Sequence, residues 1–471
     1  PTARVCRPVV WFRGSGGRLL PYGKGGYIVQ KICSIQNKIQ PNKYARISYL
    51  LFFLFAFWGP SLGGIPLGPV SLFPARIFAL AAWGLLALAV VVSRPSLTLD
   101  RSLLRSHWQQ IFFVVWLVWA VLSLIWAIDP IQGIRDMFNL FIGLSLVGLA
   151  PLFLNDRRQL NRAARIWLAT FTIFLVMAVF EHVTTLHLPI SRFSHGLQPH
   201  LAYRPTVVFV NENNFAVFIS FSIPFLLARW RYFTARKTRI LTGLGLFVSI
   251  YLLFVSGSRI NFLVLFASML IYSFLLTPRG KRLKVFALLM LLVAGTWLIF
   301  GFTQPTIRGY VARQFGKIII PRQYFDGSNS LAVRVNMIRN GILFLARTWG
   351  MGVGVGNFEA WIETAAVYDT LDILNPHNWW IELVTEYGVL ITLGYLTFFA
   401  SLLWAAWQGW KQTQGEEKWL PEALSLSLAI FPLAAISPNS FLDYLPHWLV
   451  LALALAWQQY FYKAGERKCG F

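Results

Sequence analysis

Residues 375–407 read NPHNWWIELVTEYGVLITLGYLTFFASLLWAAW. After its first four residues, this stretch stays apolar for longer than the ~20 residues that a helix needs to cross a bilayer. It therefore predicts a transmembrane α-helix. Asn375 suits the N-cap of that helix and Pro376 its first position, where the missing N–H would have no partner in any case. His377 and Asn378 are then expected in the first helical turn.

The rest of the chain has the same apolar character. Its 471 residues are 56% hydrophobic and only 13% charged. A soluble protein of this length could not bury so much apolar surface, and the apolar residues fall into runs of about 20 residues. The expected fold class is all-α, a polytopic integral membrane helical bundle with about 12 transmembrane helices. The predicted apolar segments are 47–59, 70–92, 109–127, 134–154, 162–181, 211–228, 239–255, 260–277, 285–302, 379–407, 423–437 and 446–462.

Positive charge is distributed unevenly along the chain. The net charge of +24 would suggest nucleic acid in a soluble protein, but here Lys and Arg gather in alternate connecting loops and at the chain ends. This positive-inside pattern places both termini in the cytoplasm and makes the bilayer, not nucleic acid, the expected partner. The predicted organisation is a basic, disordered cytoplasmic tail at 1–46, nine helices at 47–302, a large extracytoplasmic loop with short helices at 303–378, three helices at 379–462 and a cytoplasmic tail at 463–471.

The start of the predicted helix, which includes His377 and Asn378 in its first turn, is expected to attract anions. Its unpaired N–H groups and the positive end of the helix dipole favour negative charge, and they should lower the pKa of His377 and keep it a neutral base. Glu382 and Glu386 follow Asn378 by four and eight residues and share one helix face. Carboxylates at such a depth are candidates for function, although a structural partner for Glu386 is about as plausible as a catalytic role.

Several arginines on the predicted outer side are exceptions to the charge pattern. Arg204 lies in an outer loop, Arg259 in a turn between two spans, and Arg334 and Arg339 in an expected helix at 331–348. A guanidinium pairs bidentately with phosphate oxygens and is always charged. The plainer alternatives are a solvated loop charge, a side chain that reaches lipid headgroups, and an amphipathic surface helix. That side lacks an Asp-x-Asp motif and the three cysteines lack metal-site spacing, so arginine is expected to neutralise phosphate without a metal or another cofactor.

Four short motifs follow one another along the second half of the chain. They are Arg-Pro…Asn-x-Asn at Arg204, Pro205, Asn211 and Asn213, Ser-Gly-Ser-Arg at Ser256 to Arg259, Gly-x-Gly-x-Gly-Asn-Phe at Gly352 to Phe358, and His-Asn-x9-Gly at His377, Asn378 and Gly388. With these motifs the chain resembles the O-antigen ligase and polymerase superfamily of bacterial envelope glycosyltransferases. The resemblance covers 47–462 and is most specific over 204–388. The second glycine of that family, three residues after Gly388, is Ile391 here, which favours a polymerase over a ligase.

The resemblance implies an inverting glycosyl transfer at the outer face of the bacterial cytoplasmic (inner) membrane. The donor would be a glycan on polyprenyl (undecaprenyl) diphosphate, and the acceptor a hydroxyl of a second glycan, lipid or polymer. His377 would remove the acceptor proton, and Arg204 and Arg259 would hold the diphosphate, with Arg334 and Arg339 as weaker phosphate candidates. The residues expected to support this site are Asn378, Glu382, Glu386, Asn211, Asn213 and Gly388.

The alternative function is a transporter or flippase of polysaccharide or lipid-linked sugar, without catalysis. Such a protein is expected to line a cavity at the membrane midplane with its charges. Here the exceptional charges gather at the predicted outer interface instead, which favours the enzyme.

Overall fold

The structure is a computed structural model of the 471-residue chain and is nearly all helical. It describes residues 43–93, 107–194, 199–303, 330–438, 440 and 442–468. Three parts of the predicted organisation lie outside the described residues, namely 1–42 of the N-terminal tail, 304–329 of the outer loop and 469–471 at the C-terminal end.

Each of the twelve predicted apolar segments contains a helix. Among the described residues, seven helices (α3, α6, α7, α9, α10, α11 and α15) are long and apolar enough to cross a membrane. The helices at the predicted segments are α2 (Lys43–Ala56), α3 (Pro74–Ser93), α5 (Trp108–Ser123), α6 (Pro130–Phe153), α7 (Arg157–Thr184), α8 (Glu212–Tyr232), α9 (Arg236–Ser256), α10 (Arg259–Ile271), α11 (Arg282–Thr303), α15 (Trp379–Gln412), α16 (Trp419–Ala434) and α17 (Leu445–Lys468).

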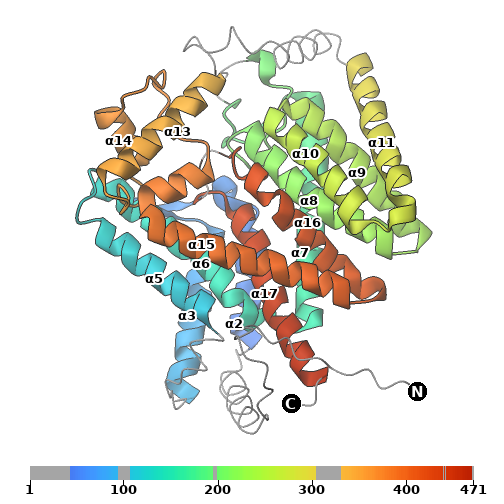
Figure 1. Ribbon diagram of the computed structural model, residues 1–471, viewed down its shortest axis with the longest axis horizontal. Coiled ribbons are helices and arrows are strands. Elements are labelled where there is room, and N and C mark those ends of the chain that lie inside the picture. Colours follow the sequence, from blue (N-terminus) through green and yellow to red (C-terminus); the bar gives the residue numbers. More distant parts are fainter. Residues whose placement is uncertain are drawn as a thin grey trace, which may run out of the picture.

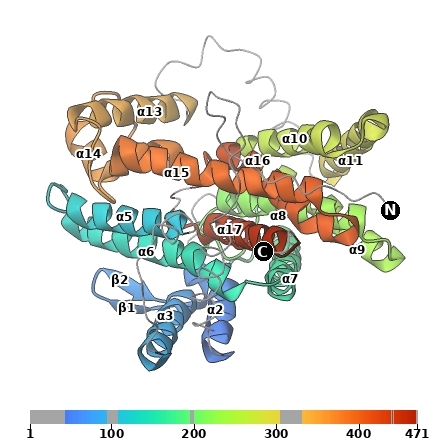
Figure 2. The same ribbon diagram turned by 60° about the horizontal axis from the view of Figure 1, so that its bottom comes forward.

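Two further helices lie between α11 and α15. The helix predicted at 331–348 is α13 (Ser330–Arg347), and it is followed by α14 (Phe358–Ala365). Both helices contact α15, and Figures 1 and 2 show them together at one end of the bundle, beside the first half of α15. The remaining short turns are η1 (Gly59–Leu62), η2 (Pro199–Leu201), η3 (Tyr272–Leu276), η4 (Arg279–Lys281) and η5 (Gly415–Lys418).

A small hairpin departs from the all-α prediction. Strands β1 (Ile65–Leu67) and β2 (Val70–Leu72) pair antiparallel, with Ile65 opposite Leu72. Gly68 has a φ of 59° in the two-residue turn between them, a conformation that glycine adopts without strain. The helix predicted from residue 70 therefore begins only at Pro74.

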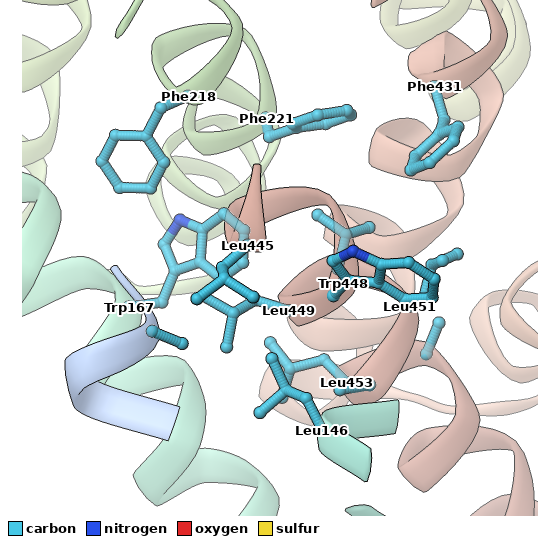
Figure 3. Packing of buried hydrophobic residues seen from close by; sticks show 14 of the residues in the cluster. Leu146, Trp167, Phe218, Phe221, Phe431, Leu445, Trp448, Leu449, Leu451 and Leu453 are labelled. Atoms are coloured by element: carbon cyan, nitrogen blue, oxygen red, sulfur yellow. The ribbon is translucent and has the colours of Figure 1, made fainter. Parts of the chain in front are cut away.

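Helix α17 forms the centre of the bundle, where it contacts α2, α6, α7, α15 and α16. Its residues from Leu449 to Ala456 are all buried, as expected for a helix that is apolar on every face. Figure 3 shows Trp448 and the leucines of α17 packed among Trp167, Phe218 and Phe431 from neighbouring helices. The helix continues to Lys468, so the tail predicted from residue 463 is helical as far as the structure describes it. Helix α2 likewise begins at Lys43, inside the predicted N-terminal tail.

Candidate functional site

His377 lies just before α15, not in its first turn. The side chain of Asn378 accepts a hydrogen bond from Trp380 N at 3.1 Å, so Asn378 is the N-cap. The expected cap, Asn375, instead accepts from His377 N at 2.9 Å and closes a local turn, an alternative that asparagine side chains readily offer. The prediction of the helix start was therefore wrong by three residues. His377 has a φ of 47°, a left-handed conformation that costs ~1–3 kcal/mol outside glycine.

The surroundings of the His377 ring keep it neutral. Burial and the nearby Arg334 guanidinium lower the pKa of His377 to about 4, against the effect of a hydrogen bond to the Pro438 carbonyl. The direction agrees with the expectation, but the causes are burial and an arginine rather than the helix dipole. Because a carbonyl only accepts, the ring nitrogen bonded to Pro438 carries the proton, and the other nitrogen has a free lone pair. The ring can therefore act as a base.

Arg334 lies near this imidazole, and Arg259 from a separate helix lies near Arg334. Arg334 on α13 donates from Nη1 to the Ile436 carbonyl at 3.3 Å. Burial and the positive charge of Arg259 lower the pKa of Arg334, so the two guanidinium groups are close enough to repel each other. Arg259 is exposed at the first residue of α10. An anion bound between these arginines would relieve their repulsion.

Arg204 reaches the same region but is held in an ion pair. Its Nη1 lies 3.2 Å from Glu212 Oε1, which also accepts from Arg192 Nη2 at 2.7 Å. The Arg204 guanidinium packs against Gly257, where a Cβ would lie 3.1 Å from Nη2. Gly257 belongs to the Ser-Gly-Ser-Arg turn that ends in Arg259. The structure thus joins the two predicted arginine motifs, and Glu212 neutralises part of their charge.

The other predicted residues have different surroundings. Arg339 is exposed, and its guanidinium lies 5.4 Å from the centre of the Tyr368 ring. Asn211 caps α8 by accepting from Asn214 N at 3.0 Å. Asn213 is half-buried in the first turn of that helix. Among the residues predicted to bind phosphate, Arg334 is close enough to His377 to lower its pKa, and Arg259 is close enough to Arg334 to lower the pKa of Arg334.

A glycine segment at 350–356 fills a break in α15. At Gly388 the backbone has φ 78° and ψ 179°, which is not helical. Carbonyls in the preceding turn therefore lose their helical partners and accept from the glycine segment instead. The hydrogen bonds across the break are Val353 N to Thr385 O at 2.8 Å, Gly354 N to Glu386 O at 3.1 Å and Val389 N to Gly350 O at 2.9 Å.

Gly352 and Gly388 meet backbone to backbone at this break. A Cβ on Gly352 would lie 2.7 Å from Gly388 N, and a Cβ on Gly388 would collide with the carbonyls of Gly350 and Met351. We call the packing of 350–356 against Gly388 the glycine lock. The glycine lock explains the motif that begins at Gly352 and the motif that ends at Gly388. The glycines of both motifs lack a Cβ, so the two backbones can approach closely.

The carboxylates of α15 bind structural donors. Glu386 accepts from Gly356 N at 3.0 Å and from Phe358 N at 3.4 Å, at the start of α14. Glu382 accepts from Ser440 Oγ at 2.9 Å. Glu386 therefore connects the glycine lock to α14, which favours its structural reading over a catalytic one. Within the ranges that the structure describes, no three His, Cys, Asp or Glu side chains are grouped to share a metal ion.

Comparison with known proteins bears on the family. Residues 244–396 match the family model described as O-antigen ligase. The chain is also 29% identical over 406 residues to the teichuronic acid biosynthesis protein TuaE of Bacillus subtilis (strain 168), which covers 83% of this chain and 80% of TuaE. Both findings support the resemblance of this chain to the O-antigen ligase and polymerase superfamily. The matched O-antigen ligase region contains Arg259, Arg334, the glycine lock and His377, whereas Arg204 precedes it.

Sequence reasoning missed three neighbours of this candidate site. Arg192 shares Glu212 with Arg204, while Pro438 and Ser440 contact His377 and Glu382 from the segment between α16 and α17. No local pattern distinguishes these residues. The one available signal was Glu212, which stands at a motif position where proline is common in the resembled family.

Proposed function

We propose that this protein is a metal-independent, inverting glycosyltransferase of surface polysaccharide, acting on a glycan carried by polyprenyl (undecaprenyl) diphosphate. The observation that carries the proposal is a neutral imidazole, His377, beside the cationic pair Arg334 and Arg259. A base next to an anion site is what displacement of a diphosphate by a sugar hydroxyl requires. The resemblance to TuaE, a protein of teichuronic acid biosynthesis, supports a polymer of the cell surface as the product.

The reaction would proceed in a single displacement. The free nitrogen of His377 accepts the proton of the acceptor hydroxyl as its oxygen bonds to the anomeric carbon. The bond between that carbon and the diphosphate oxygen breaks, and the diphosphate leaves with the electron pair. Arg334 and Arg259 stabilise the charge that develops on it. Attack opposite the leaving group inverts the anomeric centre, and the imidazolium then loses its proton readily because the His377 pKa is low.

The proposed membrane arrangement has twelve spans, with both termini in the cytoplasm and the site on the outer face of the cytoplasmic membrane. It is supported by the alternation of basic loops along the chain and by the even number of predicted segments. In this arrangement α3, α6, α8, α10, α15 and α17 all begin on the outer side. The candidate site at the start of α10 and α15 would then face glycans that have already crossed the membrane.

Reconstitution of the purified protein tests this function directly. In lipid nanodiscs with the host's polyprenyl-diphosphate-linked glycan, we expect longer glycans and free polyprenyl diphosphate, and the same rate with EDTA present. A transporter would form no new glycosidic bond, because it does not catalyse glycosyl transfer. Both sides of a nanodisc are accessible, so the measured reaction does not depend on transport. Failure to lengthen or transfer the glycan would contradict the proposal, and loss of the reaction in EDTA would contradict its metal-independence.

The pH dependence tests the role of Arg334. A base works only when it is unprotonated, so kcat/KM should fall on the acid side as pH drops through the His377 pKa, which is about 4. Arg334→Gln removes one cause of that low pKa, so the acid limb should move toward neutral pH. KM for the donor should rise as well. Arg347→Gln, at an exposed arginine of the same helix, is the matched control and should leave both the acid limb and the donor KM unchanged. An acid limb that does not move in Arg334→Gln would contradict the assignment.

A further inference from the structure

A cavity of about 440 Å³ lies between the β1–β2 hairpin, the start of α3, the start of α6, the 208–214 loop and the segment before α17. Its volume lies in the range of ~300–1,000 Å³ that is typical of small-molecule sites. The proposed reaction does not use any of the residues that line it. We call the charged and amide groups of its lining the polar wall and the aromatic side chains of its lining the aromatic wall. The two walls meet where the Arg76 guanidinium lies 4.4 Å from the centre of the Phe73 ring.

The polar wall is held rigidly by a chain of hydrogen bonds. Asn139 donates from Nδ2 to Asp443 Oδ1 at 2.6 Å and to Asp136 Oδ1 at 3.1 Å. Arg76 donates to the Asn139 amide oxygen, and its Nη1 donates to the Ser71 carbonyl at 2.6 Å. Arg76 and Asn139 are themselves buried. Groups positioned in this way need little reorganisation when a ligand binds.

Asp443 gives this wall an accessible carboxylate. Its side chain is exposed although it lines the cavity. Arg135 is also exposed and lines the same cavity. The cavity thus offers both a hydrogen-bond acceptor and a donor to an entering molecule.

The aromatic wall consists of Trp58, Phe73, Phe209 and Tyr444. Flat aromatic rings suit the C–H face of a pyranose, while carboxylate, amide and guanidinium groups pair with neighbouring hydroxyls on its rim. An acyl chain would leave the charged groups without partners at a cost. The lining therefore matches a sugar better than a lipid tail.

One short segment connects the cavity to His377. Pro438 bonds to the His377 ring. Two residues further on, Ser440 donates to Glu382 in the first turns of α15 and also lines the cavity. Asp443 follows Pro438 by five residues, and five residues span at most ~17 Å even when fully extended. The cavity is therefore within a few sugar units of the proposed base.

We propose that this cavity is a subsite that binds a sugar unit of the glycan next to the reacting one. The inference rests on the proposed function, and it adds the place at which the chain recognises its glycan. The exposed Asp443 and Arg135 bind hydroxyls of the sugar, and the aromatic wall supports its apolar face. Through this subsite the protein selects the repeat unit that it accepts, while His377 acts on a hydroxyl some distance away.

Two variants probe the subsite in different ways. Asp443→Asn keeps the shape of the side chain but removes its charge. Val70→Trp fills the cavity from the hairpin, because Val70 lines the cavity and is only half-buried. The Val70 side chain makes none of the hydrogen bonds of the polar wall. Glu363→Gln, at an exposed carboxylate of α14, is the matched control. If Asp443→Asn does not fold, Val70→Trp decides the outcome.

Binding is measured in His377→Ala protein, so that no turnover occurs. The probe is a set of oligosaccharides released by partial hydrolysis of the host's own surface polysaccharide, and KM is measured in parallel in protein that retains His377. We expect each cavity variant to raise Kd and KM about tenfold or more, with kcat changed much less, and the control to match the parent. A Kd that is unchanged in the cavity variants, or no binding in the parent up to the solubility of the probe, overturns the subsite.

These outcomes are separate from failure of the proposed function. If His377→Ala protein still transfers glycan, the catalytic base is wrong, whatever the cavity variants do to Kd. If His377→Ala abolishes transfer and the cavity variants bind normally, the function stands and the subsite fails. A phospholipid could also copurify tightly with the parent protein. If only Val70→Trp displaces this phospholipid, and oligosaccharide binding does not change, a lipid is the occupant of the cavity and the proposal is overturned.

Discussion

Replacing His377 with alanine is expected to lower kcat for glycan transfer by about 10²–10⁴-fold, the range that general bases contribute. The ring lies near Arg334, and burial together with that arginine keeps it neutral, with a pKa of about 4. Alanine removes the proton acceptor but leaves the arginines in place. Donor affinity should therefore change little, so the loss should appear in kcat rather than in KM. Steady-state transfer in nanodiscs measures both quantities.

A second histidine provides the control for this substitution. His200 is exposed in the short turn η2, and His200→Ala should keep the parental kcat. His377 also holds a left-handed φ of 47°, which asparagine tolerates better than most residues. His377→Asn therefore tests whether any loss comes from the backbone, because it should keep the local conformation and remain inactive. Parental activity in either His377 variant would contradict the catalytic role.

Replacing Gly388 with alanine is expected to be the most destabilising single change. Its φ of 78° with ψ near 180° lies in a region that is essentially restricted to glycine, and occupation by another residue costs ~1–3 kcal/mol. In addition, the new Cβ would collide with the carbonyls of Gly350 and Met351. Backbone atoms cannot rotate away as a side chain can, so the glycine lock has to open. We expect a lower Tm in detergent and loss of transfer.

The lock variant also has a matched control. Gly243 lies within α9, and a Cβ there would meet no atom within 4 Å. Gly243→Ala should be neutral or slightly stabilising, since alanine is the better helix former by ~1 kcal/mol. If Gly388→Ala has the same Tm and activity as Gly243→Ala, the lock does not hold the start of α15. Loss of activity at an unchanged Tm would instead indicate that the lock positions His377 without stabilising the bundle.

Prediction from sequence succeeded where the signal is local. Each apolar segment contains a helix, and the helix predicted at 331–348 is displaced by only one residue. Hydropathy and helical periodicity depend on neighbouring residues, so they are visible in the chain itself. The hairpin at residues 65–72 was missed because its strands are three residues long and merge into an apolar run. The start of α15 was misplaced because two asparagines, Asn375 and Asn378, were equally suited to cap it.

The candidate site was only partly visible in the sequence. His377, Arg259 and Arg334 were selected from their motifs and charges, and the structure relates them through Arg334. Arg204 was selected in the same way, but its pairing with Glu212 could not be foreseen. Arg339 was selected as well, although it lies over Tyr368. A sequence shows which residues can bind phosphate, whereas their availability depends on partners from other parts of the chain.

By itself, the sequence determined the class of protein and the places of its apolar helices, and it supplied the residues proposed as base and anion ligands. These properties follow from composition and from contacts a few residues apart. Only the tertiary structure decided that the Gly352 and Gly388 motifs form one lock, that Glu386 links this lock to α14, and that Pro438 faces His377. Such contacts join residues some 30 to 60 positions apart, and the free energy that selects them comes from packing in three dimensions, which no local pattern records.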